Sequence, residues 1–143
     1  MKTLTISQPF ASLIAFGEKF VENRTWATRY RGPIAIHAGK GTQYLTRKEL
    51  EDYPNGGIIA VAELVACISI DRIKILGGGL SMEMKSDARK YTWRELKEHR
   101  HTEGPVCWVL EGVRECEFFP CKGAQGLWTF AGELKIPEHT RNS

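Results

Sequence analysis

The sequence predicts a small α+β, mostly β domain: a closed or nearly closed β-barrel with two or three flanking helices. Short runs of β-branched and aromatic residues outnumber the stretches with helical periodicity. Glycine, proline and asparagine turns separate these runs, and the length of 143 residues suits one domain. We therefore expect a single domain over residues 1–136 and a frayed tail over residues 137–143.

The first elements follow from local patterns. Residues 3–6 (TLTI) alternate between polar and apolar side chains, which predicts a strand. Residues 10–14 (FASLI) place apolar side chains on one helical face, and Gly17 is a natural helix stop. The charges after Gly17 do not repeat at helical spacing, so the chain there should be extended. Residues 34–38 (IAIHA) predict a buried strand.

Two further helices and the remaining strands complete the predicted domain. Residues 46–53 (TRKELEDY) begin with a capping-box pattern and predict a short helix. Residues 58–70 (IIAVAELVACISI) form the most apolar run and predict a central strand. The polar segment 86–100 predicts a third helix. The last strands are expected over residues 106–110, 114–119 and 127–130.

Composition limits the class of protein. The net charge of +3 permits an anionic partner without requiring one. No apolar run approaches the roughly 20 residues that cross a bilayer, and the N-terminus lacks a signal-peptide pattern. The four cysteines fit no common zinc spacing. We expect a cytoplasmic protein with reduced thiols, no membrane partner, no metal and no cofactor.

Basic and aromatic side chains are interleaved between residues 19 and 31. The basic residues are Lys19, Arg24, Arg29 and Arg31, and the aromatic ones are Phe20, Trp26 and Tyr30. Cations bind phosphates, and unpaired bases stack on rings, so this pattern favours RNA or single-stranded nucleic acid. The alternative is an ordinary solvated surface.

The candidates for chemistry are Glu63, Lys19, Glu22 and His37. Glu63 is the only charged residue in the run 58–70, where a carboxylate is costly unless it is paired or faces water or a cavity. Lys19 lies at the helix stop, where it can converge with Glu22 to hold a phosphate or to support catalysis. His37 ends an apolar strand and is either an acid–base group in a cleft or a structural histidine. A surface ion-pair cluster with an exposed Glu63 remains the alternative.

The stretch GEKFVENR, with Gly17, Lys19, Glu22 and Arg24, resembles the GxKxxExR signature of the ASCH (activating signal cointegrator homology) family. Its flanks resemble the family in the same order: QPFASL, YRGPIAIHA, YPNG, the strand that carries Glu63, and GAQGLW. The resemblance covers about residues 2–130. It implies a PUA-like β-barrel in which the signature lines a ligand cleft.

The resemblance also implies a class of ligand: RNA, single-stranded nucleic acid or a nucleoside-like small molecule. The expected ligand-binding residues are Lys19, Glu22, Arg24, Trp26, Arg29, Arg31 and His37. Family members include nucleic-acid-binding modules, ribonucleases and amidohydrolases that deacetylate acetylcytidine, so the fold alone does not fix the function.

The amidohydrolase branch provides the alternative. Its lysine and glutamate fall on Lys19 and Glu63, but its threonine falls on Glu22, which removes the hydroxyl nucleophile. We therefore predict an RNA-binding protein. The alternative is a metal-independent hydrolase of RNA or modified nucleosides with Lys19, Glu22 and Glu63 as its catalytic residues.

Overall fold

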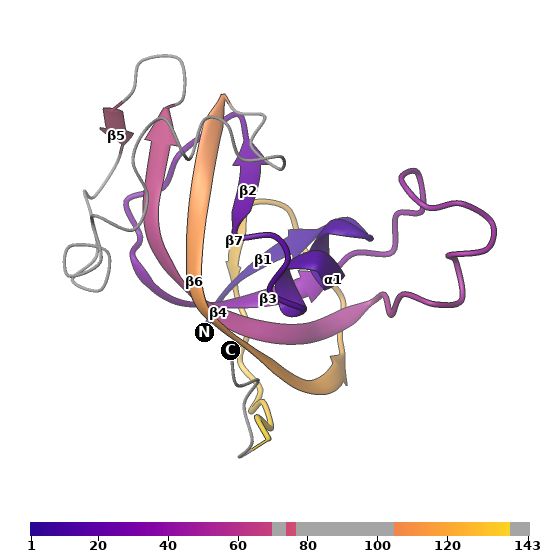
Figure 1. Cartoon of the computed structure of the whole chain (residues 1–143). Coiled ribbons are helices and arrows are strands. Elements are labelled where there is room, and N and C mark those ends of the chain that lie inside the picture. Colours follow the sequence, from indigo (N-terminus) through magenta and orange to yellow (C-terminus); the bar gives the residue numbers. More distant parts are fainter. Residues whose placement is uncertain (70–73, 77–104, 138–143) are drawn as a thin grey trace. The chain divides into compact units, whose positions relative to one another are not determined.

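The computed structural model describes residues 1–69, 74–76 and 105–137, and strands dominate it (Figure 1). The elements are β1 (Lys2–Ile6), α1 (Phe10–Ala15), β2 (Val21–Arg24), β3 (Gly32–Ala38), β4 (Gly57–Ser69), β5 (Lys74–Leu76), β6 (Val106–Pro120) and β7 (Leu127–Thr129). The predicted mostly β fold class is therefore confirmed.

The chain divides into two compact units, and each is described by itself. Unit 1 comprises Met1–Lys19, Pro33–Ala62 and Gly112–Ser143. Unit 2 comprises Phe20–Gly32 and Glu63–Glu111. The long strands β4 and β6 each contribute one part to both units.

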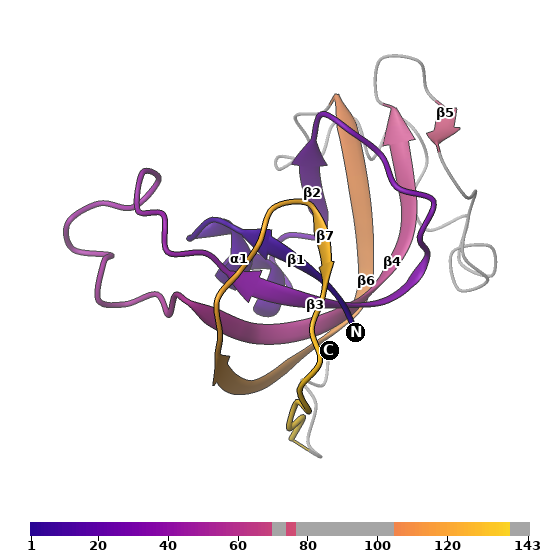
Figure 2. The same ribbon diagram turned by 180° about the vertical axis from the view of Figure 1, so that it is seen from behind.

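Unit 1 is built around β1. The strand order is β6-β4-β3-β1-β7, with β1 parallel to β3 and antiparallel to β7 (Figures 1 and 2). Thr5 lies opposite His37 in the parallel pair, and Thr3 lies opposite Trp128 in the antiparallel pair. Buried side chains of this unit form a core cluster that contains Ala35, Ile58, Val61 and Phe130.

The predicted first helix is confirmed, and a buried glutamine fixes its start. Gln8 has no exposed surface. Its Oε1 accepts the Ser12 N–H at 2.9 Å, and its Nε2 donates to Ser12 Oγ at 2.8 Å and to the Pro54 carbonyl at 2.7 Å. At the other end, the chain leaves the helix through Gly17, whose φ is +82°.

The helix predicted over residues 46–53 is wrong. Glu49 Oε1 accepts the Thr46 N–H at 2.8 Å, as a capping box requires. The backbone then makes hydrogen bonds between residues three positions apart, as in turns. The Glu49 N–H donates to the Thr46 carbonyl and the Asp52 N–H to the Glu49 carbonyl, both at 3.0 Å. The segment is a series of turns because it is mostly exposed and has no apolar face to pack.

Among the described residues, α1 is the only α-helix. The helix predicted over residues 86–100 lies outside the described residues, as does the tail from residue 138 onward.

Unit 2 has the strand order β2-β6-β4-β5. β2 pairs antiparallel with β6, and β5 pairs antiparallel with β4. Val21, Val65, Cys107 and Val109 belong to its buried core cluster, against which Phe20 packs. The three-residue β5 was not predicted, because so short a segment shows no periodicity.

The two strands predicted over residues 106–110 and 114–119 are one strand, β6. Gly112 lies in its middle with φ +60°, a conformation that glycine adopts without strain. A glycine next to a charged residue, here Glu111, resembles a turn in the sequence, but the strand continues through it.

Candidate functional site

An ion pair lies on one face of β2. Glu22 is opposite Trp108 in the register, and Arg24 is two residues further along the same face. Arg24 Nη2 lies 2.9 Å from Glu22 Oε2. The Glu22 side chain is only 11% exposed and that of Arg24 23%. Because both charges are partly withdrawn from water, the carboxylate holds the guanidinium more firmly than a fully exposed pair would.

Trp26 follows β2 and is held by a second tryptophan. Its side chain is among the exposed large hydrophobic ones, at 37%. The fully buried Trp108 donates its Nε1–H to the Trp26 carbonyl at 2.9 Å. The two rings meet edge to face, with centroids 4.8 Å apart and an interplanar angle of 82°. The exposed ring of Trp26 is thus held in place next to β2, the strand that carries the Glu22–Arg24 pair.

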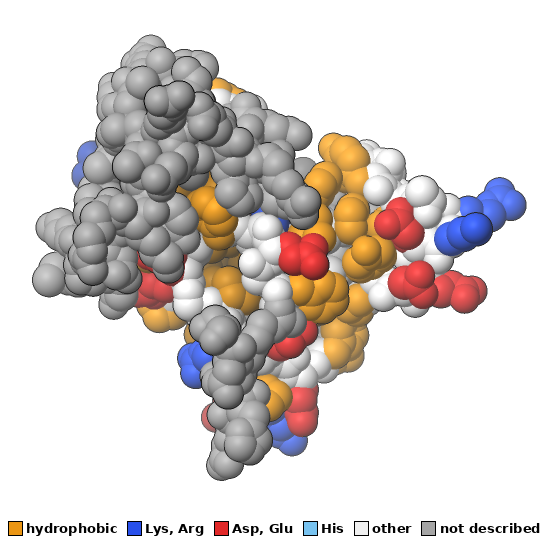
Figure 3. All heavy atoms as spheres, in the orientation of Figure 1, with side chains coloured by type: hydrophobic (Ala, Val, Ile, Leu, Met, Phe, Trp, Pro, Cys, Tyr) orange, Lys and Arg blue, Asp and Glu red, His pale blue; other side chains and the backbone are white. Residues whose placement is uncertain are grey.

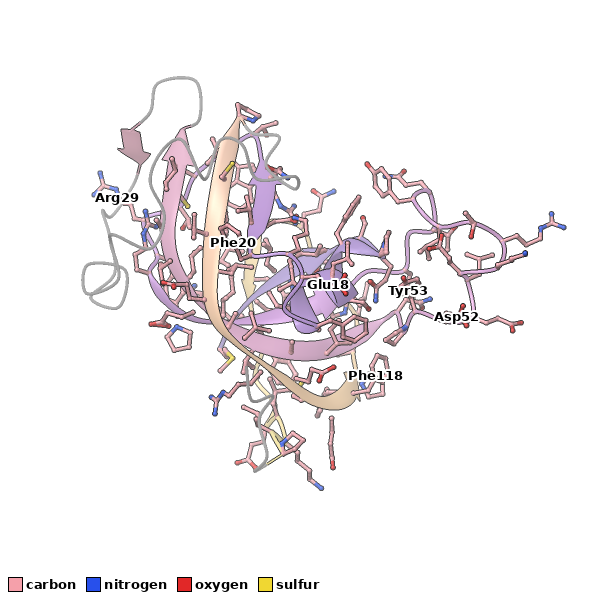
Figure 4. The ribbon with its side chains drawn as sticks, in the orientation of Figure 1. Glu18, Phe20, Arg29, Asp52, Tyr53 and Phe118 are labelled. Atoms are coloured by element: carbon pink, nitrogen blue, oxygen red, sulfur yellow. The ribbon has the colours of Figure 1, made fainter. Side chains whose placement is uncertain are left out.

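The two other predicted arginines of this segment, Arg29 and Arg31, differ in their contacts. Arg31 Nη1 donates to the carbonyls of Thr28 at 2.7 Å and Tyr30 at 2.8 Å, so its guanidinium orders its own loop. Arg29 is exposed, and its side chain projects away from the strands (Figure 4). The Arg29 guanidinium is therefore open to solvent, whereas that of Arg31 is held by the backbone of its own loop.

Glu63 is half-buried on β4, between buried neighbours. Burial and, second, the Glu63 carboxylate raise the pKa of Tyr30 above its ordinary value. The Tyr30 phenol therefore stays protonated at neutral pH and can donate a hydrogen bond. Tyr30 was missing from the predicted site, although its position between two arginines was visible in the sequence.

Lys19 belongs to unit 1, where it follows α1. It is 3% exposed, and its Nζ lies 5.8 Å from the centroid of the Phe10 ring. Its backbone N–H donates to the Leu13 carbonyl at 3.1 Å. The helix end thus places this lysine against an aromatic face, within reach of a cation–π interaction.

His37 also belongs to unit 1 and is 2% exposed. Its Nε2 lies 2.8 Å from the Cys121 carbonyl, which only accepts, so Nε2 carries the proton. Its ring meets Trp128 edge to face at 5.6 Å. His37 borders a cavity of about 760 Å³ inside this unit.

Exposed hydrophobic side chains of unit 1 gather near α1 and the segment before β4 (Figure 3). Phe16, Tyr44, Leu50 and Phe118 are between 41% and 54% exposed. Tyr44 packs on the Phe10 ring, with centroids 5.1 Å apart. Glu18, Asp52 and Tyr53 lie in the same region (Figure 4).

The chain has four free cysteines, and burial raises the pKa of the thiols of Cys67, Cys116 and Cys121. Within residues 1–69, 74–76 and 105–137, no three His, Cys, Asp or Glu side chains are grouped so that they could hold a metal ion. In the same ranges, no helix is long and apolar enough to span a membrane.

Comparisons with known proteins give the relationships of the chain. The ASCH domain family model matches residues 4–118. Human activating signal cointegrator 1 is 33% identical over 148 residues, which cover 92% of this chain and 22% of that protein. The mouse protein of the same name is 38% identical over 82 residues, which cover 46% of this chain and 14% of that protein. The chain thus spans about a fifth of the length of the human relative.

Solved structures resemble the chain more distantly. A mutant of ZmASCH from Zymomonas mobilis superposes with a TM-score of 0.46 at 15% identity, over 83% of this chain and 74% of that one. Another ZmASCH structure gives 0.40 at 16% identity, over 83% and 72%. The family match covers most of the sequence and includes the GxKxxExR signature. The chain belongs to the ASCH domain family.

Proposed function

We propose that this ASCH domain binds single-stranded RNA through unit 2, with the Glu22–Arg24 pair, Trp26 and Arg29 as its contact residues. The observation that carries the proposal is the fixed, exposed Trp26. It is 37% exposed, yet Trp108 holds it by a hydrogen bond and by an edge-to-face contact. A ring held in this way loses little conformational freedom when a base stacks on it.

The basic residues of this segment suit a nucleic-acid backbone. Exposed Arg29 pairs with phosphate, and Arg24, oriented by Glu22, presents a second guanidinium on the strand that precedes Trp26. Stacking on a single aromatic side chain contributes about 1–3 kcal/mol per base and tolerates any base. Modest sequence preference and strong salt dependence are expected.

Fluorescence anisotropy with a labelled single-stranded RNA tests the proposal. Trp26→Ala should weaken binding by about tenfold or more, because one stacking contact is lost. Arg29→Ala should weaken binding and reduce its salt dependence. Tyr44→Ala and Arg47→Ala are the matched controls, because each removes an exposed aromatic or basic side chain from unit 1.

Lys19→Ala tests separately whether the lysine of the signature contributes to binding. The proposal fails if no affinity is measured at low salt, or if the combined Trp26→Ala and Arg29→Ala variant binds RNA as the unaltered protein does.

A metal-independent hydrolase of RNA or modified nucleosides is the second candidate. The proximity of Glu63 to the protonated Tyr30 phenol favours it, because a carboxylate and a phenol can exchange roles as base and acid. With this function, the predicted catalytic residues are Lys19, Glu22 and Glu63. Mass spectrometry of a panel of RNAs and acylated nucleosides would detect turnover. Activity that survives a chelator and disappears in Glu63→Gln and Lys19→Ala supports this candidate, whereas activity that persists in both variants excludes it.

A further inference from the structure

The cavity of unit 1 lies where the parallel strands β1 and β3 end. Its volume of about 760 Å³ falls in the range of small-molecule sites, roughly 300–1,000 Å³. Thr5 and His37, opposite each other in the parallel register, both border it. The segment after β6 supplies another wall, with Cys121, Gly123 and Gln125. Two strand ends and one loop thus border an open pocket of ligand size.

Both lysines that line the cavity are positively charged. Lys40 and Lys122 border the cavity, and none of its eleven described lining residues is acidic. The side chain of Lys40 lies directly over Gly56: a Cβ at residue 56 would lie 2.8 Å from Lys40 Cε. The missing side chain at Gly56 therefore lets Lys40 run along the cavity edge. Two ammonium groups on a wall whose described residues include no carboxylate favour an anion.

His37 adds an unsatisfied polar atom to the cavity wall. Its Nε2–H is used by the Cys121 carbonyl. Its Nδ1 is buried and has no hydrogen-bond partner among the described residues. A buried polar atom without a partner is uncommon in proteins and points to a missing one. Nδ1 accepts a hydrogen bond in the neutral ring and donates one in the charged ring.

A phosphomonoester satisfies either form of the ring. Its P–OH donates to a neutral Nδ1, and its P–O⁻ accepts from a protonated Nδ1, while the remaining oxygens pair with the lysines. Gly123 lies close over this nitrogen: a Cβ there would be 2.8 Å from Nδ1 and 2.7 Å from Thr5 Oγ1. A side chain at residue 123 would therefore fill the space beside Nδ1, and the glycine keeps that space free of one.

From these observations we propose that the cavity of unit 1 binds a phosphomonoester group through Lys40, Lys122 and His37 Nδ1. The group comes either from a free nucleotide or from the phosphorylated end of an RNA strand. This site belongs to unit 1 and does not depend on RNA binding by unit 2.

Nuclear magnetic resonance with isotope-labelled histidine tests the proposal on the whole chain, because it reads each ring nitrogen separately. Inorganic phosphate and a nucleoside monophosphate are titrated at constant ionic strength, beside the unphosphorylated nucleoside. The His37 Nδ1 signal should shift saturably with both phosphates and stay unchanged with the nucleoside. An unchanged Nδ1 signal with both phosphates would overturn the proposal.

Variants identify the partners. Lys40→Ala combined with Lys122→Ala should weaken phosphate binding by about tenfold or more. Lys48→Ala combined with Lys135→Ala is the control, because it removes two exposed lysines of unit 1 that do not border the cavity. Equal affinities in the two double variants would contradict the assignment. His37→Gln keeps a donor for the Cys121 carbonyl but lacks Nδ1, so its affinity should also fall.

RNA strands that differ only in a terminal phosphate separate the two sources. A preference for the phosphorylated strand that persists in Trp26→Ala and disappears in the Lys40 and Lys122 double variant assigns the site to strand ends. No such preference, together with nucleotide binding, assigns it to free nucleotides. Neither result depends on whether Trp26 binds RNA, which the Trp26→Ala variant tests separately.

Discussion

Trp108 donates its Nε1–H to the Trp26 carbonyl at 2.9 Å, and the ring of the buried tryptophan meets that of the exposed one at 4.8 Å. The core of unit 2 thus fixes the position of an aromatic side chain at its surface. A substitution of Trp108 should therefore change how a ligand stacks on the Trp26 ring.

Trp108→Phe should show this coupling. Phenylalanine retains an aromatic ring but has no N–H, so the Trp26 carbonyl loses its donor. We expect a loss of about 1–3 kcal/mol in the free energy of unfolding, measured in urea, and a severalfold loss of RNA affinity. Trp128→Phe is the control, because it removes the donor to Thr5 Oγ1 at 3.1 Å in unit 1. Equal RNA affinities in the two variants would show that Trp26 is not held through Trp108.

The pKa of Tyr30 should respond to Glu63. Because the raised pKa favours the protonated phenol in the folded state, its contribution to stability is complete below the ordinary tyrosine pKa of about 10 and is lost as pH rises through the raised value. Glu63→Gln removes one cause of the shift, so Tyr30 should ionise at lower pH.

A tyrosinate absorbance titration, corrected with Tyr30→Phe, measures this ionisation. Glu133→Gln, at an exposed position of unit 1, should leave the curve unchanged. If the Glu63→Gln curve also coincides with that of the unaltered protein, the carboxylate does not act on Tyr30.

Gln8 should be sensitive to the loss of its amide. In Gln8→Glu, an oxygen replaces the Nε2 that donates to Ser12 Oγ and to the Pro54 carbonyl. The Pro54 carbonyl, which only accepts, would then face an ionised, buried carboxylate, whereas the Ser12 hydroxyl can turn to donate. We expect a loss of about 3 kcal/mol in urea unfolding at neutral pH. Acid should reduce the loss, because protonation restores one donor. Gln43→Glu, the same change at an exposed position, should have little effect.

Gly57 should not tolerate a side chain. A Cβ there would lie 2.6 Å from the Phe119 carbonyl oxygen and 2.6 Å from Phe118 Cζ, at the bend of β6 (Figure 4). The carbonyl belongs to the backbone and cannot turn away, so Gly57→Ala should cost about 1–3 kcal/mol of unfolding free energy. Gly41→Ala is the control, because no atom lies within 4 Å of its Cβ position. Similar stabilities of the two variants would contradict this packing.

Patterns within a few residues predicted much of the fold. The alternation of residues 3–6 and the apolar run 58–70 gave β1 and β4, and the apolar face before Gly17 gave α1. The failures have the same local origin. The capping signal at Thr46 is satisfied by a turn, and Gly112 resembles a chain break although β6 passes through it.

The sequence also predicted candidate site residues, but not their partners. The extended chain predicted after Gly17 is confirmed by β2, which puts Glu22 and Arg24 on one face, where they pair. The assignment of Arg31 to a ligand did not anticipate its bonds to the Thr28 and Tyr30 carbonyls, because such bonds depend on the path of the loop. The contact of His37 with Cys121 joins residues 84 positions apart, a relation that no local pattern contains.

The position of β1 between β3 and β7 has a consequence for synthesis on the ribosome. Lys2 pairs with Thr129, and the Met1 ammonium donates to the Phe130 carbonyl at 2.7 Å. One edge of β1 therefore has no partner until β7 has been translated. An unpaired strand edge is a template for wrong pairing, so the nascent chain should be most prone to aggregation just before β7 emerges from the exit tunnel.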